Sequence, residues 1–316
     1  MTRGVVPEVP AAVRVFGTPP LSTCARFVTR RRLRVIGYHD VPDADVFAAH
    51  VRHLVRHYTP VDGEAVAAWV RDGASLPDRA VWVTFDDGYR SVVDVAMPLL
   101  TAANVPATAF VCPGPVTQGS FHWWDRLPPD ISAADRRALV EVDDRERRRR
   151  VSGFEACAPP PAGRWALASV ADLHRWVDAG HQLGNHSWDH PSLDRCRPDE
   201  QRSQIARTTE WLDGEFGPAS RPFAYPHGHV TVEAQTELAR RGSSLAVGYD
   251  HRLAGAGDRW ALSRLRIAGD DPVWRLEAAL AGLQPVALAA AQGLLTMTRH
   301  RLAGLGDARL RLPMIG

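Results

Sequence analysis

The chain has 316 residues, of which 45% are hydrophobic, enough to build a full core as one large α/β domain. Its formal net charge of +2 is small for this length, so no overall field favours nucleic acid or an anionic membrane. The first twenty residues lack the charged start and the apolar stretch of a secretion signal. The apolar stretch 285–295 is shorter than the ~20 residues that cross a bilayer. We therefore expect a cytoplasmic protein without nucleic-acid partners or stable membrane insertion, in an oligomeric state that the sequence leaves open.

Short apolar runs alternate along the chain with segments of helical period, a pattern that favours parallel strands joined by crossover helices. Seven strands are expected, at 33–38, 81–85, 107–112, 182–184, 222–225, 244–248 and 264–267. Helices with apolar residues at three- and four-residue spacing are expected at 46–58, 91–103, 170–179, 200–216 and 231–241. Seven parallel strands suit a barrel better than a flat sheet.

The expected domain division is an N-terminal extension over 1–32, a barrel over 33–270 and a helical tail over 271–316. Within the barrel, residues 115–164 break the alternation, and an excursion of this length indicates a functional loop or a small helical insertion. We expect it to act as a lid or as one wall of a substrate site. Its arginine run 147–150 could bind phosphate, but acidic residues precede the run, which favours a solvated helix face.

Two adjacent carboxylates, Asp86 and Asp87, follow the apolar strand 81–85 directly. A buried carboxylate without a matching charge tends to become neutral, and a metal ion would supply that charge. The alternative is that both aspartates make a turn together with Gly88.

Two histidines, His186 and His190, follow the short strand 182–184. Their spacing of four can bring both imidazoles to one side of a helical turn. A catalytic metal site commonly uses three protein ligands and leaves one position open, and imidazole and carboxylate suit zinc. Together with the aspartates, these histidines complete a set of two imidazoles and one carboxylate.

Two further strand ends would meet this set, because the carboxyl ends of barrel strands gather on one face. The segment 221–228 ends a strand in a turn rich in proline and glycine, which can direct a backbone N–H at a developing oxyanion or can be a plain tight connection. The segment 37–40 ends the first strand and places His39 at the same rim.

These segments resemble the polysaccharide deacetylase family, also known as NodB homology or carbohydrate esterase family 4. The segment 84–88, with sequence TFDDG, resembles its first motif, His186-Ser187-x-x-His190 resembles its second, and 223–228 resembles a divergent third. The resemblance covers roughly 33–270. It implies a distorted (β/α)7 barrel, Asp86 as the general base, and Asp87, His186 and His190 as ligands of one divalent metal ion, with zinc expected.

Three departures from the family pattern concern the third motif and the general acid. The arginine that usually orients the base is replaced by Ala224, so Arg221 and Arg264 are the candidates for that role. His227 stands where a tyrosine is usual. The C-terminal motif that carries the general acid is missing, and 36–40 resembles it in an N-terminal position, as in the permuted exopolysaccharide deacetylases. His39 is therefore the expected acid, with His227 and His251 as rivals.

The implied reaction is hydrolysis of the acetamido group of an N-acetylated amino sugar in a glycan or glycoconjugate. His227, Tyr225 and Trp188 are assigned to the substrate and oxyanion side, and Trp123 and Trp124 could also stack on sugar rings or fill a core. One alternative is a related C–N hydrolase for a small N-acyl compound, such as a natural-product intermediate. Another is a barrel that binds glycans without catalysis.

Overall fold

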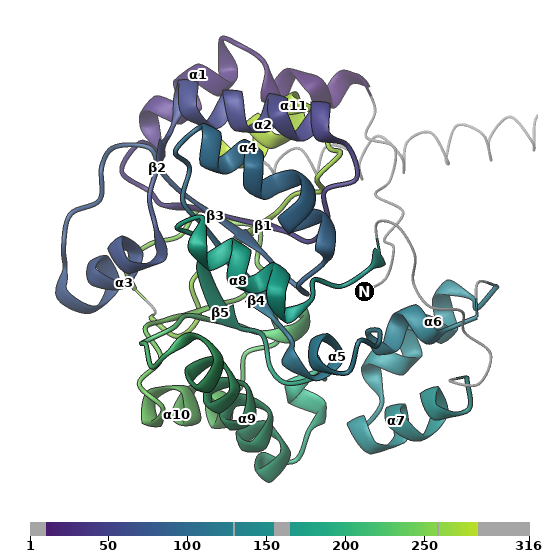
Figure 1. Cartoon of the computed structure of the whole chain (residues 1–316). Helices are drawn as coiled ribbons and strands as arrows, with labels where there is room; N and C mark the ends of the chain where they lie inside the picture. Colours follow the sequence, from purple (N-terminus) through teal and green to yellow (C-terminus); the bar gives the residue numbers. More distant parts are fainter. Residues whose placement is uncertain (1–10, 129, 155–164, 258, 284–316) are drawn as a thin grey trace, which may run out of the picture.

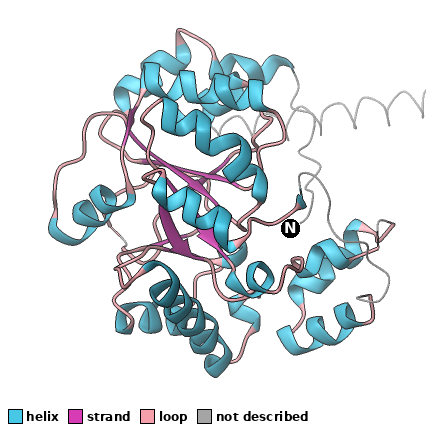
Figure 2. Cartoon of the chain, viewed as in Figure 1, coloured by secondary structure: helices cyan, strands magenta, loops and turns pink. Residues whose placement is uncertain are grey.

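The computed structural model describes residues 11–128, 130–154, 165–257 and 259–283. Its centre is one sheet in which all strands are parallel, surrounded by helices (Figure 2). The strands are β1 (Arg34–Tyr38), β2 (Thr59–Pro60), β3 (Ala80–Phe85), β4 (Ala107–Val111), β5 (Gln182–Asn185), β6 (Phe223–Ala224), β7 (Ala246–Val247) and β8 (Leu265–Arg266).

The strands run in the order β7-β6-β5-β4-β3-β1-β8, and β2 pairs with the first two residues of β3. A parallel bridge between Val247 and Leu262, just ahead of β8, links the two ends of this order. The sheet therefore closes on itself as the distorted (β/α) barrel that the sequence predicts. All seven expected strands are confirmed, whereas β2 was missed because it is two residues long and contains a proline.

Helices cover the outside of the barrel (Figure 1). They are α1 (Leu21–Val28), α2 (Ala44–His57), α3 (Gly63–Asp72), α4 (Met97–Ala102), α8 (Val170–Asp178), α9 (Pro198–Phe216), α10 (Val232–Arg240) and α11 (Val273–Leu280). Short helical turns lie at η1 (Ala11–Gly17), η2 (Val92–Ala96), η5 (Leu193–Arg195) and η6 (Pro226–Gly228). None of the helices in the described part of the chain is long and apolar enough to cross a membrane.

The five expected helices are present, and one of them is irregular. The segment 91–103 forms a π-helical turn, η2, followed by α4. Pro98 in the first turn of α4 has no N–H to donate, so a regular α-helical ladder cannot run through this point. Helix α3, which was not expected, follows β2 and is capped by the Asp62 side chain.

Alternate residues of each strand face opposite sides of the sheet, which separates two apolar cores. Ile36 and Val83 belong to the core between sheet and helices. Val35, Trp82 and Phe110 belong to the core inside the barrel. By the same alternation, Asp86 continues the inward set of β3 at the point where that strand ends.

The insertion forms a separate helical lobe beside the barrel, at the lower right of Figure 1. It comprises α5 (Pro113–Thr117), η3 (Trp123–Arg126), α6 (Ala133–Glu141) and α7 (Asp144–Ser152), with a small core around Trp123, Trp124 and Leu139. The part of the insertion at 155–164 lies outside the described residues, as do 1–10 of the N-terminal extension and 284–316 of the tail. The described parts of that extension and that tail pack together through η1, α1 and α11.

Candidate active site

Polar side chains from five strand ends meet at one rim of the barrel. His39 follows β1, Asp86 and Asp87 follow β3, His186 and His190 follow β5, His227 follows β6 and Tyr249 follows β7. The strands are parallel, so their carboxyl ends lie at the same face and join residues that are far apart in the sequence.

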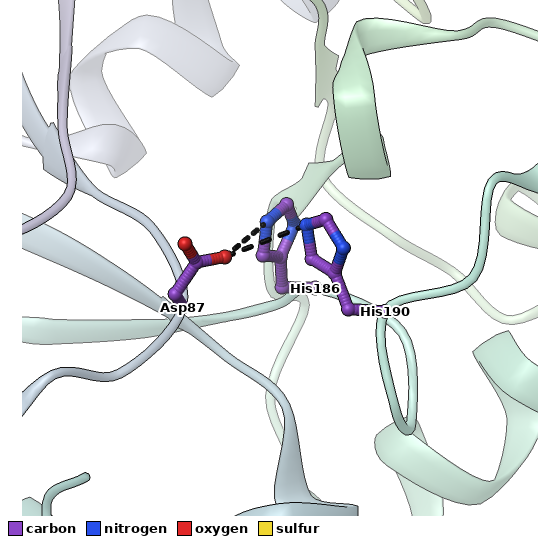
Figure 3. Close-up of side chains that lie close together, drawn as sticks. All are labelled: Asp87, His186 and His190. Atoms are coloured by element: carbon purple, nitrogen blue, oxygen red, sulfur yellow. Dashed lines mark ion pairs between the residues drawn. The ribbon is translucent and has the colours of Figure 1, made fainter. Parts of the chain in front are cut away.

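Asp87, His186 and His190 form a compact buried cluster (Figure 3). Asp87 Oδ1 lies 3.4 Å from His186 Nε2 and 3.4 Å from His190 Nε2. One ligand atom from each residue fits within 4.8 Å of the others. Both Asp87 oxygens and both Nε2 atoms are buried without a hydrogen-bond partner among the described residues. Buried polar groups are normally paired, so these converging atoms fit a divalent cation.

The backbone bends sharply to aim these ligands. Asp87 and His190 have φ values of 73° and 59°, a left-handed conformation that non-glycine residues seldom adopt. Ser187, between the two histidines, has φ 65°. The segment from His186 to His190 is therefore a loop, and the helical turn expected from its spacing is wrong.

This loop has no helical ladder of hydrogen bonds. Hydrogen bonds to neighbouring elements fix its conformation instead. Asn185 Oδ1 accepts from the Ser187 N–H at 2.8 Å, and Gln204 Oε1, from α9, accepts from the Trp188 N–H at 2.8 Å. His186 donates from Nδ1 to the Ala224 carbonyl oxygen at 2.8 Å. This bond leaves the Nε2 lone pair of His186 directed at Asp87, which is the tautomer a metal ligand needs.

Asp86 is fully buried and is held by an arginine and a tyrosine. Arg264 donates from both terminal nitrogens to the two carboxylate oxygens, at 2.7 and 2.9 Å, and Tyr249 donates its hydroxyl to Oδ2 at 2.9 Å. Burial raises the pKa of Asp86, but Arg264, His186 and His39 outweigh burial and keep the pKa below its ordinary value. The carboxylate is thus charged and fixed in orientation beside the cluster.

The Arg264 backbone lies deeper in the barrel than Asp86. Arg264 precedes Leu265, which pairs with Ile36 near the middle of β1, whereas Asp86 follows Phe85, which pairs with the last residue of β1. Its side chain runs through the interior, 5.5 Å from the Phe110 ring and 4.1 Å from the Tyr249 ring. Ala224, which has a small side chain where the family usually has an arginine, belongs to the same inner core as Phe110.

Two sequence assignments need correction. Arg221 contacts Asp213 and the Gly217 carbonyl oxygen, so of the two candidate arginines Arg264 is the one beside Asp86. The Tyr225 side chain is fully buried between sheet and helices, where its ring lies 5.0 Å from the Phe223 ring. Its side chain therefore does not face a substrate.

His39 lies beside Asp86, and His227 lies beside His190. His39 Nε2 lies 4.0 Å from Asp86 Oδ2, and burial lowers the pKa of His39 to about 4 although Asp87 and Asp86 act in the opposite direction. The His227 ring lies 4.8 Å from the His190 ring, and burial lowers its pKa to about 3. His227 has φ 57°, so the turn after β6 is bent as the sequence indicates.

Tyr249 and His122 were left without a role by the sequence, whereas Trp124 was expected to stack on sugar rings or to fill a core. Tyr249 follows β7, and its position after a strand was the signal that could have found it. His122, from the insertion, is hydrogen-bonded through Nε2 to the Asp87 carbonyl oxygen at 2.9 Å, and so supports the bent backbone of that residue. Trp124 stacks on His122 with ring centres 4.3 Å apart and meets the His190 ring edge-on at 4.7 Å.

Comparison with known proteins fits this arrangement. The family model described as "Polysaccharide deacetylase" matches residues 73–245, which is more than half of the chain. The match contains Asp86 and the three clustered residues, whereas His39, Tyr249 and Arg264 lie outside it.

Curated relatives carry deacetylase names. The poly-beta-1,6-N-acetyl-D-glucosamine N-deacetylase of Staphylococcus epidermidis is 20% identical over 202 residues, which is 63% of this chain and 58% of that relative's length. The peptidoglycan-N-acetylglucosamine deacetylase of Bacillus cereus is 38% identical over 75 residues, which is 24% of this chain and 27% of that relative. The chain thus matches less than two thirds of the length of each of these relatives.

Solved structures share the fold. The Streptococcus pyogenes deacetylase PplD, in complex with acetate, aligns with a TM-score of 0.60 at 19% identity over 79% of this chain and 98% of that one. IcaB from Ammonifex degensii aligns with a TM-score of 0.57 at 22% identity over 80% of this chain and 97% of that one. With the family match and the motif residues gathered at one rim, the chain belongs to the polysaccharide deacetylase family.

Proposed function

We propose that this protein is a metal-dependent hydrolase that removes the N-acetyl group from an N-acetylated amino sugar in a glycan or glycoconjugate. The observation that carries the proposal is the buried cluster of Asp87, His186 and His190, whose ligand atoms lack partners, beside a charged Asp86 held by Arg264. A divalent ion bound there, with zinc as our first expectation, would polarise the acetamide carbonyl and make water a stronger acid.

Asp86 is proposed as the general base. Its carboxylate is charged, and its orientation is fixed by Arg264 and Tyr249. Each carboxylate oxygen has two lone pairs, so the three bonds from these residues leave an acceptor site open for the proton of an attacking water. The two aspartates then have separate roles, Asp86 as base and Asp87 as metal ligand. The left-handed backbone of Asp87 directs its side chain into the cluster with the two histidines.

His39 is proposed as the donor of the proton to the departing nitrogen. With a pKa of about 4 its ring is neutral at pH 7, so it has to receive this proton within the reaction. Its Nε2 lies 4.0 Å from Asp86 Oδ2, which already accepts from Arg264 and Tyr249, so a transfer between these two atoms requires Tyr249 to release Oδ2 and the ring to move by about 1 Å. The proton would then pass from water through Asp86 and His39 to the nitrogen, while the bond from carbon to water oxygen forms and the C–N bond breaks.

His227 is the rival donor because its ring lies next to that of His190, at 4.8 Å between ring centres. It is also the residue whose turn we propose to face the oxyanion. Replacing each histidine by alanine distinguishes the two roles: His39→Ala should lose most turnover, and His227→Ala should retain more of it.

The test of the function is acetate release from N-acetylated mono-, oligo- and nucleotide-linked sugars, with and without added zinc, cobalt or nickel. Release should stop when a chelator removes the metal and return when one equivalent of metal is added. Release that continues while elemental analysis finds no metal would overturn the metal dependence. No release from any substrate would favour the barrel that binds glycans without catalysis.

The same screen addresses the alternative substrate class. Acetate release from small N-acyl compounds but from no sugar would favour the related C–N hydrolase. The expected cytoplasmic location stays a prediction, which fractionation of cells that express the full chain would test.

A further inference from the structure

The insertion is attached to both loops that carry the cluster residues. Where the chain enters it, the N–H of Gly114 donates to the Trp188 carbonyl oxygen, in the loop of the cluster histidines, at 2.8 Å. A Cβ at position 114 would lie 2.7 Å from the same oxygen, so glycine permits this close approach. Where the chain leaves the insertion, the N–H of Ala168 donates to the Gly88 carbonyl oxygen, directly after Asp87, at 2.9 Å. The position of the insertion and the positions of the two loops are therefore coupled.

An ion pair adds to this attachment. Arg148, from α7, places two nitrogens on the Asp189 carboxylate at 2.6 and 3.0 Å. Gln204, from α9, donates to the same carboxylate at 2.8 Å. Asp189 directly precedes His190, so α7 is held next to a residue of the cluster.

The other arginines of the run 147–150 are matched within the insertion, which argues against a phosphate ligand. Arg147 is buried and pairs with Asp144. Arg149 and Arg150 pair with Glu146. The phosphate-binding alternative for this run is therefore not favoured, and the solvated face holds for its last two arginines.

His122, from the insertion, restrains the backbone of Asp87. Its side chain is buried, and its Nε2 lies 2.9 Å from the Asp87 carbonyl oxygen. A carbonyl oxygen can only accept, so Nε2 carries the proton of this bond. The left-handed backbone of Asp87 costs about 1–3 kcal/mol and persists only where its surroundings hold it. The bond from His122 is one such restraint, and it acts on the residue whose carboxylate faces the cluster histidines.

The two cluster histidines differ in how their second nitrogen is held. His186 donates from Nδ1 to the Ala224 carbonyl oxygen at 2.8 Å, the kind of outer bond that orients most metal-ligating histidines. His190 Nδ1 is buried and has no hydrogen-bond partner among the described residues. Its ring instead packs edge-on against the rings of Trp124 and His227, at 4.7 and 4.8 Å between ring centres. Ring packing therefore orients His190, and Trp124 of the insertion supplies one of these contacts.

His122 and Trp124 form one packed unit. Their rings are stacked, with centres 4.3 Å apart and an angle of 8° between the planes. Trp124 Nε1 donates to the Tyr89 hydroxyl at 3.1 Å. Tyr89 stands two residues after Asp87, so the unit is bonded to this loop through both His122 and Trp124.

We propose that the described part of the insertion is a metal-retention element, in which His122 positions Asp87 and Trp124 positions His190. The inference rests on the proposed function, because it concerns the metal of that site. It adds that residues outside the ligand set determine how tightly the metal is held. The role of the insertion as a lid or as a wall of a substrate site stays a separate prediction.

The first test compares two matched tryptophan variants. Trp123 and Trp124 are 7% and 6% exposed and belong to the same small core of the insertion, but of the two only Trp124 has a described ring contact with His190. The dissociation constant of zinc is measured by competition with a chromogenic chelator. Loss of an outer partner of a metal ligand commonly weakens metal binding by about 10- to 100-fold, and we expect this for Trp124→Leu. Trp123→Leu should stay close to the wild-type constant.

A second variant tests the hydrogen bond to Asp87. His122→Phe retains a ring that can stack on Trp124 but has no N–H to donate, so it should also weaken zinc binding by about 10- to 100-fold. His122→Gln retains an N–H donor and should recover part of the affinity. The visible absorption spectrum of the cobalt-loaded protein reports the geometry of the ligands. It should change in Trp124→Leu and His122→Phe and stay as in the wild type in Trp123→Leu.

Unchanged zinc affinity and an unchanged cobalt spectrum in both Trp124→Leu and His122→Phe would overturn the inference and leave the proposed function intact. Equal losses in Trp123→Leu and Trp124→Leu would also overturn it, because weakened packing inside the insertion would then explain both. Metal binding by the wild type without acetate release from any substrate would contradict the proposed function alone. A wild-type protein that binds no divalent metal would overturn both.

Discussion

Replacing Arg264 by alanine should destabilise the barrel and stop turnover together. Arg264 and Asp86 are both fully buried, and two contacts of 2.7 and 2.9 Å join them. Removing one partner of a buried ion pair costs about 3–5 kcal/mol, because the other charge is left in the interior. We expect a loss of unfolding free energy near 3 kcal/mol, at the lower end, because Tyr249 still donates to the carboxylate.

The assay is urea unfolding followed by circular dichroism at pH 7, in which the midpoint should fall while the slope stays constant. Acetate release should fall by at least about 10²-fold, since a base displaced by about 1 Å loses that much rate. Arg264→Lys retains the positive charge but not the two-pronged contact, so it should lie between wild type and Arg264→Ala in both measurements.

Arg221 offers the matched control. It also pairs with an aspartate, Asp213, but the two side chains are 12% and 35% exposed and lie away from Asp86. Arg221→Ala should therefore cost no more than about 1 kcal/mol and leave turnover unchanged. If Arg264→Ala matched Arg221→Ala in stability and retained turnover, the reasoning that Arg264 orients a buried base would be refuted.

Four other variants probe the site. His186→Ala should lose bound metal and turnover together, and full metal occupancy by elemental analysis would contradict its role as a ligand. Asp86→Asn should keep the metal but lower turnover by at least about 10²-fold, and near-normal acetate release would exclude it as the base. His39→Ala should fold, keep the metal and lose about 10²- to 10⁴-fold in kcat, whereas a smaller loss would move the acid role elsewhere. Gly37→Ala would place a Cβ 2.2 Å from the Tyr249 hydroxyl oxygen, so it should displace that ring and reduce kcat; unchanged kcat would show that the tyrosine contact is dispensable.

The sequence by itself determined the strand and helix pattern and the central motif residues. Buried parallel strands appear as short apolar runs, such as the six buried residues of β3, and crossover helices as runs of helical period, so both patterns can be read locally. Asp86, Asp87, His186 and His190 each follow such a strand, and parallel strands end at one rim. Their convergence could therefore be predicted without knowing how the barrel closes.

Only the tertiary structure decided which partners surround Asp86. Arg264 starts lower in the barrel and reaches the carboxylate through the interior, whereas Arg221, closer in sequence to the third motif, is held by Asp213. Tyr225 stands within that motif yet faces the core between sheet and helices, while Tyr249 donates to the base. Such choices depend on side-chain direction across a closed sheet, where one residue of register reverses the face. The position of the insertion against the histidine loop depends likewise on contacts such as Arg148 with Asp189, 41 positions apart, which no local pattern encodes.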